Sequence, residues 1–182
     1  MKNILLLGDS GRMQYQPAVK ELMKDEAEVY GPEENCRWSG YLLNSLRFWL
    51  PAMPAPDIVQ FNCGLWDMGD DYHEGRHFYP PELYEETLHR IFRALRLTTG
   101  REDLKIMVAT TTPTMYEDHR DVEIYNGILT RAALQEGAAV NDLYAVIAPE
   151  KESLLREDKM HLNEEGVRRA AEATAKALRG MM

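Results

Sequence analysis

The sequence predicts a three-layer α/β/α sandwich built around a five-stranded parallel sheet. Apolar runs typical of strands alternate with amphipathic helical patterns, which is the signature of an α/β fold. The first run, residues 3–8, is almost continuously apolar, as expected of a parallel strand buried on both faces. The 182 residues contain no repeat or linker and suit a single domain over residues 1–182.

Five short segments carry the strand signal. Residues 26–30 are short and partly charged, which places that strand at an edge of the sheet. Residues 104–110 are rich in β-forming side chains and end before Pro113. The five expected strands are residues 3–8, 26–30, 57–63, 104–110 and 138–143.

Five other segments have the period of an amphipathic helix. The clearest is residues 81–97, and the last begins after Asn163, the expected N-cap. The other helices are expected over residues 17–24, 40–50 and 121–135. The side chains expected to face the core in three of these helices are Val19, Leu22, Met23, Tyr84, Leu88, Ile91, Phe92, Leu95, Tyr125, Ile128, Leu129 and Ala132. This arrangement is flavodoxin-like.

Composition excludes several functional classes. Hydrophobic residues make up 45% and charged residues 28%, which argues against intrinsic disorder. The net charge of −9 argues against binding to nucleic acid or an anionic membrane. No early apolar run is long enough for a membrane span or a signal peptide, so we expect no membrane insertion and no targeting segment. Cys36 and Cys63 form no disulfide framework and suit a cytoplasmic protein.

Ser10 is a candidate nucleophile just after the first strand. It lies in Gly8-Asp9-Ser10-Gly11, where flanking glycines permit a tight turn that exposes the hydroxyl. In parallel sheets, ligands bind at the carboxyl ends of the strands, and a following helix N-terminus favours a developing negative charge there. The alternative is that Asp9 or Ser10 only caps a helix or turn.

His161 is a candidate base before the last helix, in Asp158-Lys-Met-His161. A serine hydroxyl needs a base, and histidine is the usual one near neutral pH. The histidine in turn needs an acceptor on its other ring nitrogen, and Asp158 is close enough in sequence to supply it. The alternative is a solvated turn in which Asp158 is a local cap.

The two motifs together resemble the SGNH/GDSL hydrolase family. The segment Asn35-Cys-Arg-Trp-Ser39-Gly40 is similar to its second block, and Phe61-Asn62-Cys-Gly64-Leu-Trp66-Asp67 to its third. The blocks occur in the family's order and span essentially the whole chain.

The resemblance implies acyl transfer through a covalent Ser10 intermediate. His161 would move the proton, Asp158 would orient the histidine, and the backbone amides of Ser10 and Gly40 would hold the oxyanion. It implies no metal and no organic cofactor.

One departure from the family concerns the third oxyanion donor. The family's third block usually reads Gly-x-Asn-Asp, but Trp66 occupies the asparagine position here. Asn62 is the better substitute because it ends a strand at the correct edge and carries an amide donor. Trp66, whose indole N–H also donates, and a hole with two donors remain the alternatives.

Four residues are expected at the substrate: Asp9, Arg37, Trp66 and Tyr116. Arg37, like Arg12, can bind an anionic group, although surface salt bridging is the commoner role of arginine. Trp66 and Tyr116 can supply flat apolar surfaces, unless they pack in the core.

The loop after the third strand contains His73 and His77 with several carboxylates. Glycines and Pro80 mark this segment as a loop, so the i, i+4 spacing of the histidines loses its helical meaning. We therefore expect a solvated rim rather than a metal site.

The sequence thus predicts a serine esterase acting on short-chain acyl esters of small molecules, with O-acetyl groups on carbohydrate as the leading candidate. The enzymatic alternative is a thioesterase or lysophospholipase-type hydrolase. The other alternative is an inactive binding module that keeps the fold. Whether the chain forms a homo-oligomer stays open.

Overall fold

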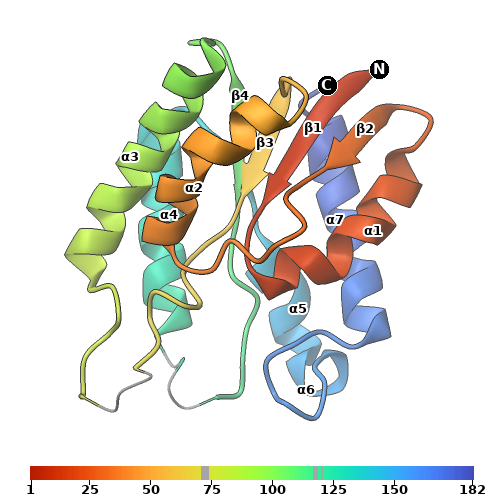
Figure 1. Cartoon of the computed structure of the whole chain (residues 1–182). Coiled ribbons are helices and arrows are strands. Elements are labelled where there is room, and N and C mark those ends of the chain that lie inside the picture. Colours follow the sequence, from red (N-terminus) through yellow and green to blue (C-terminus); the bar gives the residue numbers. More distant parts are fainter. Residues whose placement is uncertain (71–73, 117–118, 120) are drawn as a thin grey trace.

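The computed structural model of the chain describes residues 1–70, 74–116, 119 and 121–182. Five parallel strands form one sheet in the order β2-β1-β3-β4-β5 (Figure 1). The strands are β1 (Lys2–Leu7), β2 (Ala27–Tyr30), β3 (Ile58–Phe61), β4 (Lys105–Ala109) and β5 (Ala139–Asn141). The chain runs outward from β1 to β2 and then returns to β3 on the other side of β1. The segments after β1 and β3 therefore flank the topological switch point, where α/β proteins bind ligands.

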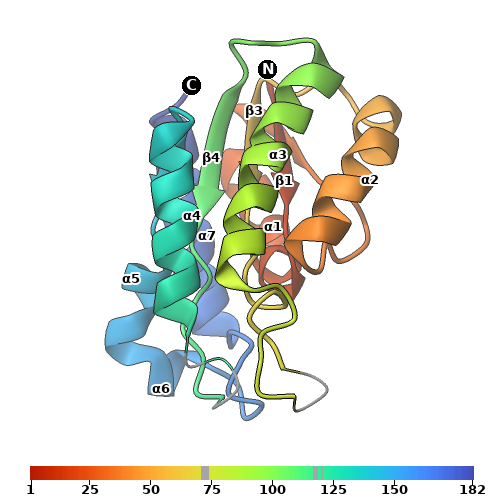
Figure 2. The ribbon, with the colours of Figure 1, turned by 90° about the vertical axis from the view of Figure 1, so that its left-hand side faces the viewer.

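Helices cover both faces of the sheet. The group α2 (Ser39–Ala52), α3 (Pro81–Thr99) and α4 (Val122–Gln135) lies on the face that Figure 2 presents. The opposite face carries α1 (Ser10–Met23), α5 (Leu143–Ile147) and α7 (Glu164–Arg179). A 3-10 turn (Ala148–Glu150) and the short α6 (Lys151–Leu154) join α5 to α7.

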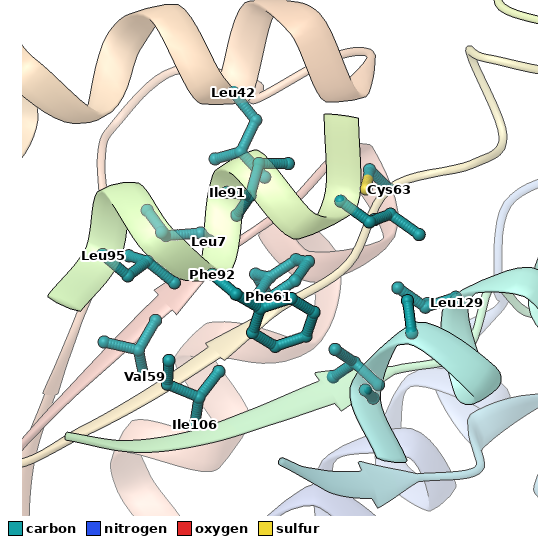
Figure 3. Close-up of a cluster of buried hydrophobic side chains, with 14 of the residues drawn as sticks. Leu7, Leu42, Val59, Phe61, Cys63, Ile91, Phe92, Leu95, Ile106 and Leu129 are labelled. Carbon is teal, nitrogen blue, oxygen red and sulfur yellow. The ribbon is translucent and has the colours of Figure 1, made fainter. Parts of the chain in front are cut away.

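A separate apolar core lies on each face of the sheet. Alternate residues of β1 serve both, because Leu5 and Leu7 belong to one core while Ile4 and Leu6 belong to the other. In the first core, Phe61 and Phe92 pack edge to face with their ring centroids 5.1 Å apart. Figure 3 shows both side chains in this core. All four β1 residues are fully buried, which is why this strand reads as a continuous apolar run.

The predicted fold class is confirmed, including the edge position of the second strand. The predicted helix over residues 17–24 is wrong at its start, since α1 begins at Ser10 and holds Pro17 inside it. The first half of α1 buries Arg12 and Tyr15, so it lacks an apolar period. Leu22 is 42% exposed rather than buried, because Tyr15, Val19 and Met23 define the buried face. The helices within residues 143–154 were not predicted, because each is too short to show a period.

In the part of the chain that the structure describes, no helix combines the length and apolar character needed to cross a membrane.

Candidate active site

Ser10 is the first residue of α1, directly after the end of β1. Asp9 is the N-cap of this helix, and its Oδ1 accepts a hydrogen bond from the Gly11 amide at 2.9 Å. Asp9 is buried, and burial raises the pKa of its carboxyl despite hydrogen bonds from Asn62 and Gly11. A Cβ at position 8 would lie 1.9 Å from Asn62 Oδ1, so only glycine lets Asn62 approach the turn.

His161 lies on a turn that folds back before α7. The turn is closed by a bond from the Arg156 amide to the His161 carbonyl at 2.7 Å, with Lys159 in the left-handed region at φ 62°. Asp158 Oδ1 accepts bonds from the backbone amides of Met160 and His161. These two bonds lower the pKa of Asp158 to about 2, so its carboxylate is ionised at neutral pH.

The structure brings Ser10, His161 and Asp158 into one hydrogen-bonded chain. Ser10 Oγ lies 2.9 Å from His161 Nε2, and His161 Nδ1 lies 2.8 Å from Asp158 Oδ2. Since Asp158 is ionised, it accepts a hydrogen bond from Nδ1–H, which leaves Nε2 to accept a hydrogen bond from the serine hydroxyl. This arrangement can remove the proton from Ser10 as its oxygen attacks an electrophile.

The α2 N-terminus lies beside the Ser10 turn. The Cys36 amide donates to the Gly8 carbonyl at 2.9 Å, which joins the loop before α2 to the end of β1. Gly40 is the second residue of α2, where backbone amides have no intrahelical acceptor. A Cβ on Gly40 would lie 2.4 Å from the Tyr79 hydroxyl. Tyr79, near the end of the loop between β3 and α3 (the rim loop), therefore packs directly against this position. Gly40 does not line the cavity at Ser10.

Asn62 lines that cavity, and its side chain hydrogen-bonds to Asp9. It is buried, and its Oδ1 has no hydrogen-bond partner among the described residues. Trp66 instead is 40% exposed and is not among the residues that line the cavity. The geometry therefore places Asn62, rather than Trp66, beside Ser10.

Two cavities of very different size meet at His161. The smaller has a volume of about 30 Å³. It contains Ser10, His161 and Asn62, and its other lining residues include Leu65, Thr110, Thr111, Thr112, Leu143 and Met160. The larger is an open hollow of about 840 Å³ that shares Met160 and His161 with the smaller. Its lining includes Tyr116, which is 49% exposed.

Asp67 is a buried carboxylate to which the sequence analysis gave no role. It accepts bonds from the Ser39 amide at 3.0 Å and from the Ser39 hydroxyl at 2.5 Å. Burial raises its pKa to about 6, against the lowering effect of these bonds. Its position in the third family block is the one sequence signal that could have identified it.

Of the two arginines proposed near the substrate, Arg12 lines the cavity at Ser10 and Arg37 does not. Arg37 is exposed, and its guanidinium stacks over the Tyr41 ring at 4.7 Å, away from both cavities. Arg12 is buried and donates to the carbonyls of Pro32 and Glu34, so its charge holds the loop after β2.

The rim histidines divide between described and undescribed parts of the chain. His73 lies outside the described residues. His77 Nδ1 bonds the Met68 carbonyl at 2.8 Å, and its Nε2 lies 3.1 Å from Asp121, so this ring braces the rim loop against the start of α4. Among the described residues there is no cluster of three side chains able to hold a metal ion.

Comparison of the sequence with protein-family models gives no match, and comparison with curated proteins gives none. Solved structures do match. An acetyl xylan esterase, AlAXEase, superposes with a TM-score of 0.81 at 18% identity, covering 97% of this chain and 99% of that one. A carbohydrate esterase family 3 protein from Talaromyces cellulolyticus gives 0.78 at 20% identity, with coverage of 100% and 98%. A lipase/acylhydrolase from Enterococcus faecalis gives 0.81 at 16% identity, with coverage of 100% and 97%.

At these identities the likeness shows a shared fold. The chain has the fold of the SGNH/GDSL hydrolases, as the resemblance of its motifs predicted.

Proposed function

We propose that this protein is a serine esterase that removes short acyl groups from small-molecule esters. The observation that carries the proposal is the chain of hydrogen bonds from Ser10 through His161 to Asp158, at 2.9 and 2.8 Å. These three side chains lie at the switch point of a sheet whose structural neighbours include esterases and an acylhydrolase.

In the proposed reaction, Ser10 Oγ attacks the ester carbonyl while His161 Nε2 takes the hydroxyl proton. The ionised Asp158 holds the proton on Nδ1 and stabilises the imidazolium that forms. His161 then protonates the leaving alcohol, and water releases the acyl group from Ser10 by the same route. The Ser10 amide and the Asn62 side chain, which line the cavity, are proposed oxyanion donors, together with the Gly40 amide that the family resemblance implies.

The sizes of the two cavities support a small acyl group and a larger alcohol. A cavity of about 30 Å³ has room for about two water molecules, which suits an acetyl group rather than a long chain. The open hollow of about 840 Å³ has space for an alcohol of the size of a sugar. Acetyl groups on carbohydrate are therefore the proposed substrate class, in line with the acetyl xylan esterase among the neighbours.

The chain-length dependence of ester hydrolysis tests this proposal. We expect p-nitrophenyl acetate to be turned over with kcat/KM at least about tenfold above that of the octanoate, because the longer chain exceeds the small cavity. For Ser10→Ala we expect turnover to fall to background and the circular dichroism spectrum to match that of the native protein. Preference for octanoate would instead favour the thioesterase or lysophospholipase alternative.

A fluorophosphonate probe separates an enzyme from an inactive binding module. The probe phosphonylates a serine only where a base activates it, so we expect labelling of the native protein and none of Ser10→Ala. A native protein that is neither labelled nor active on any ester would overturn the esterase proposal.

We also propose that residues 1–182 act as one domain and that the protein works in the cytoplasm. Both cysteines are buried and unpaired, which agrees with a reducing compartment.

A further inference from the structure

Gln14 makes a two-point contact with the backbone of the residue that follows His161. Its side-chain Nε2 donates to the Leu162 carbonyl at 3.0 Å, and its Oε1 accepts from the Leu162 amide at 3.2 Å. These residues are 148 positions apart in the sequence. A glutamine amide carries a donor and an acceptor side by side, so it pairs with the N–H and C=O of one residue much as a neighbouring strand would.

Gln14 stands one helical turn after Ser10 on α1. Residues four apart lie on the same face of a helix, and both of these line the small cavity. Ser10 thus meets the imidazole of His161 while Gln14 meets the backbone N–H and C=O of the next residue, Leu162. One face of α1 therefore holds both the side chain and the backbone of the turn.

The other hydrogen bonds of this turn go to elements other than α1. Leu155 and Leu162 form a local antiparallel bridge, and Arg156 Nε donates to the Leu162 carbonyl. The Met115 amide donates to the Lys159 carbonyl, which joins the turn to the loop after β4. Within the described part of the chain, the hydrogen bonds between α1 and the turn come from Ser10 and Gln14.

We propose that Gln14 is a positioning residue that sets the distance between Ser10 Oγ and His161 Nε2. This inference rests on the proposed esterase function. The Ser10–His161 bond changes at every step of the reaction, because the proton leaves Ser10 and later returns. The contact to Leu162 involves no reacting atom, so it keeps the turn in place throughout the cycle.

Loss of this contact is expected to slow chemistry more than binding. A displacement of about 1 Å between reacting groups can cost about 100-fold in rate. For Gln14→Met, which keeps the length of the side chain without its amide, we expect kcat for p-nitrophenyl acetate to fall about 10- to 100-fold. We expect KM to change less than about threefold, because ground-state binding does not need the aligned pair.

Gln16 offers a matched control on the same helix. Its Oε1 accepts a hydrogen bond from Arg12 Nη1, and among the described residues Gln16 makes no hydrogen bond to the His161 turn. Gln16→Met is expected to keep kcat within about threefold of the native value. Gln14→Ala is the second test variant, in case the methionine side chain is not accommodated.

The experiment measures kcat, KM, the second-order rate of fluorophosphonate labelling and the melting temperature for all four proteins. The expected result is a parallel fall of kcat and labelling rate in the folded Gln14 variants alone. Gln14 variants that lose melting temperature but keep both rates within threefold of Gln16→Met would overturn the positioning role. A native protein with neither turnover nor labelling would overturn the esterase proposal itself, and this inference with it.

Discussion

Asn62 is the side chain that we propose as the third oxyanion donor. It is buried beside Ser10 and hydrogen-bonded to Asp9, whereas the Trp66 ring is 40% exposed outside the small cavity. An amide held by a neighbouring carboxylate is already oriented when charge develops on the substrate oxygen, which is the condition for strong electrostatic stabilisation.

Replacing each of these two residues tests this assignment. Asn62→Ala is expected to lower kcat by about 10²- to 10³-fold, the usual cost of losing one oxyanion donor. Trp66→Ala is expected to change kcat less than about fivefold, because its indole does not reach the cavity at Ser10. Steady-state kinetics on p-nitrophenyl acetate provide the measurement. The reverse ranking of the two variants would assign the donor to Trp66.

The sequence could identify the residues whose partners are close in the chain or whose motif is specific. Asp158 and His161 are three positions apart, and Ser10 lies in a recognisable turn after an apolar strand. Gln14 and Asp67 were not predicted, because each acts through a backbone group brought near only by folding. Nothing in the local sequence of Gln14 shows that its side chain meets Leu162.

At the scale of elements, the start of α2 depends on a carboxylate from another segment. The N-cap Trp38 offers no side-chain bond to this helix, and Asp67 instead accepts the Ser39 amide. The negative charge of this capping carboxylate also interacts favourably with the positive N-terminal end of the helix dipole. Asp67 thereby joins the rim loop to the helix that carries Gly40.

Replacing Asp67 by asparagine is expected to flatten the dependence of stability on pH. Burial raises the pKa of Asp67 to about 6, so the folded state holds this proton more tightly than the unfolded chain, whose aspartate titrates near 4. The unfolding free energy that Asp67 contributes is therefore fully present at low pH. About 3 kcal/mol of it is lost as the pH rises from about 4 to about 6. Asp67→Asn keeps an acceptor for the Ser39 amide and does not titrate.

Urea unfolding at pH 4.5 and 7.5 measures this difference. The stability of Asp67→Asn relative to the native protein should rise by about 1–3 kcal/mol between the two pH values. Asp158 does not interfere, because its lowered pKa means that its stabilising contribution is complete above about pH 4 and is lost only below that value. An equal difference at both pH values would contradict the titration assigned to Asp67.

Element boundaries were predictable where a helix buries an apolar stripe. The expected helix over residues 81–97 agrees with α3 (Pro81–Thr99), and its five expected core residues are buried. The start of α1 was missed because its first turns bury Arg12 and the polar side chain of Tyr15. Those turns form because Asp9 caps the helix, which a search for apolar periodicity does not detect.

At the scale of the whole molecule, the site joins the two ends of the chain. Ser10 begins α1 and His161 precedes α7, and these helices pack side by side on one face of the sheet (Figure 1). The buried face of α7 is made of small residues: Gly166, Ala170, Ala171, Thr174 and Ala175, with Leu178 at its end. Small side chains let α7 approach closely, so the packing of α7 against α1 contributes, together with Gln14, to where the His161 turn meets α1.

Overpacking on this face should therefore affect activity as well as stability. Ala171 is fully buried in the core that also contains Val19 and Met23 of α1, while Ala132 is fully buried in α4 on the other side of the sheet. Leucine at either position is expected to cost about 1–3 kcal/mol of unfolding free energy. Only Ala171→Leu should also lower kcat by about tenfold, because it pushes α7 and the His161 turn away from Ser10. Chemical denaturation, followed by kinetics at a temperature where both variants are folded, measures the two effects. Equal kcat values for the two variants would mean that the site tolerates displacement of α7, and that the contacts of Ser10 and Gln14 alone hold the turn.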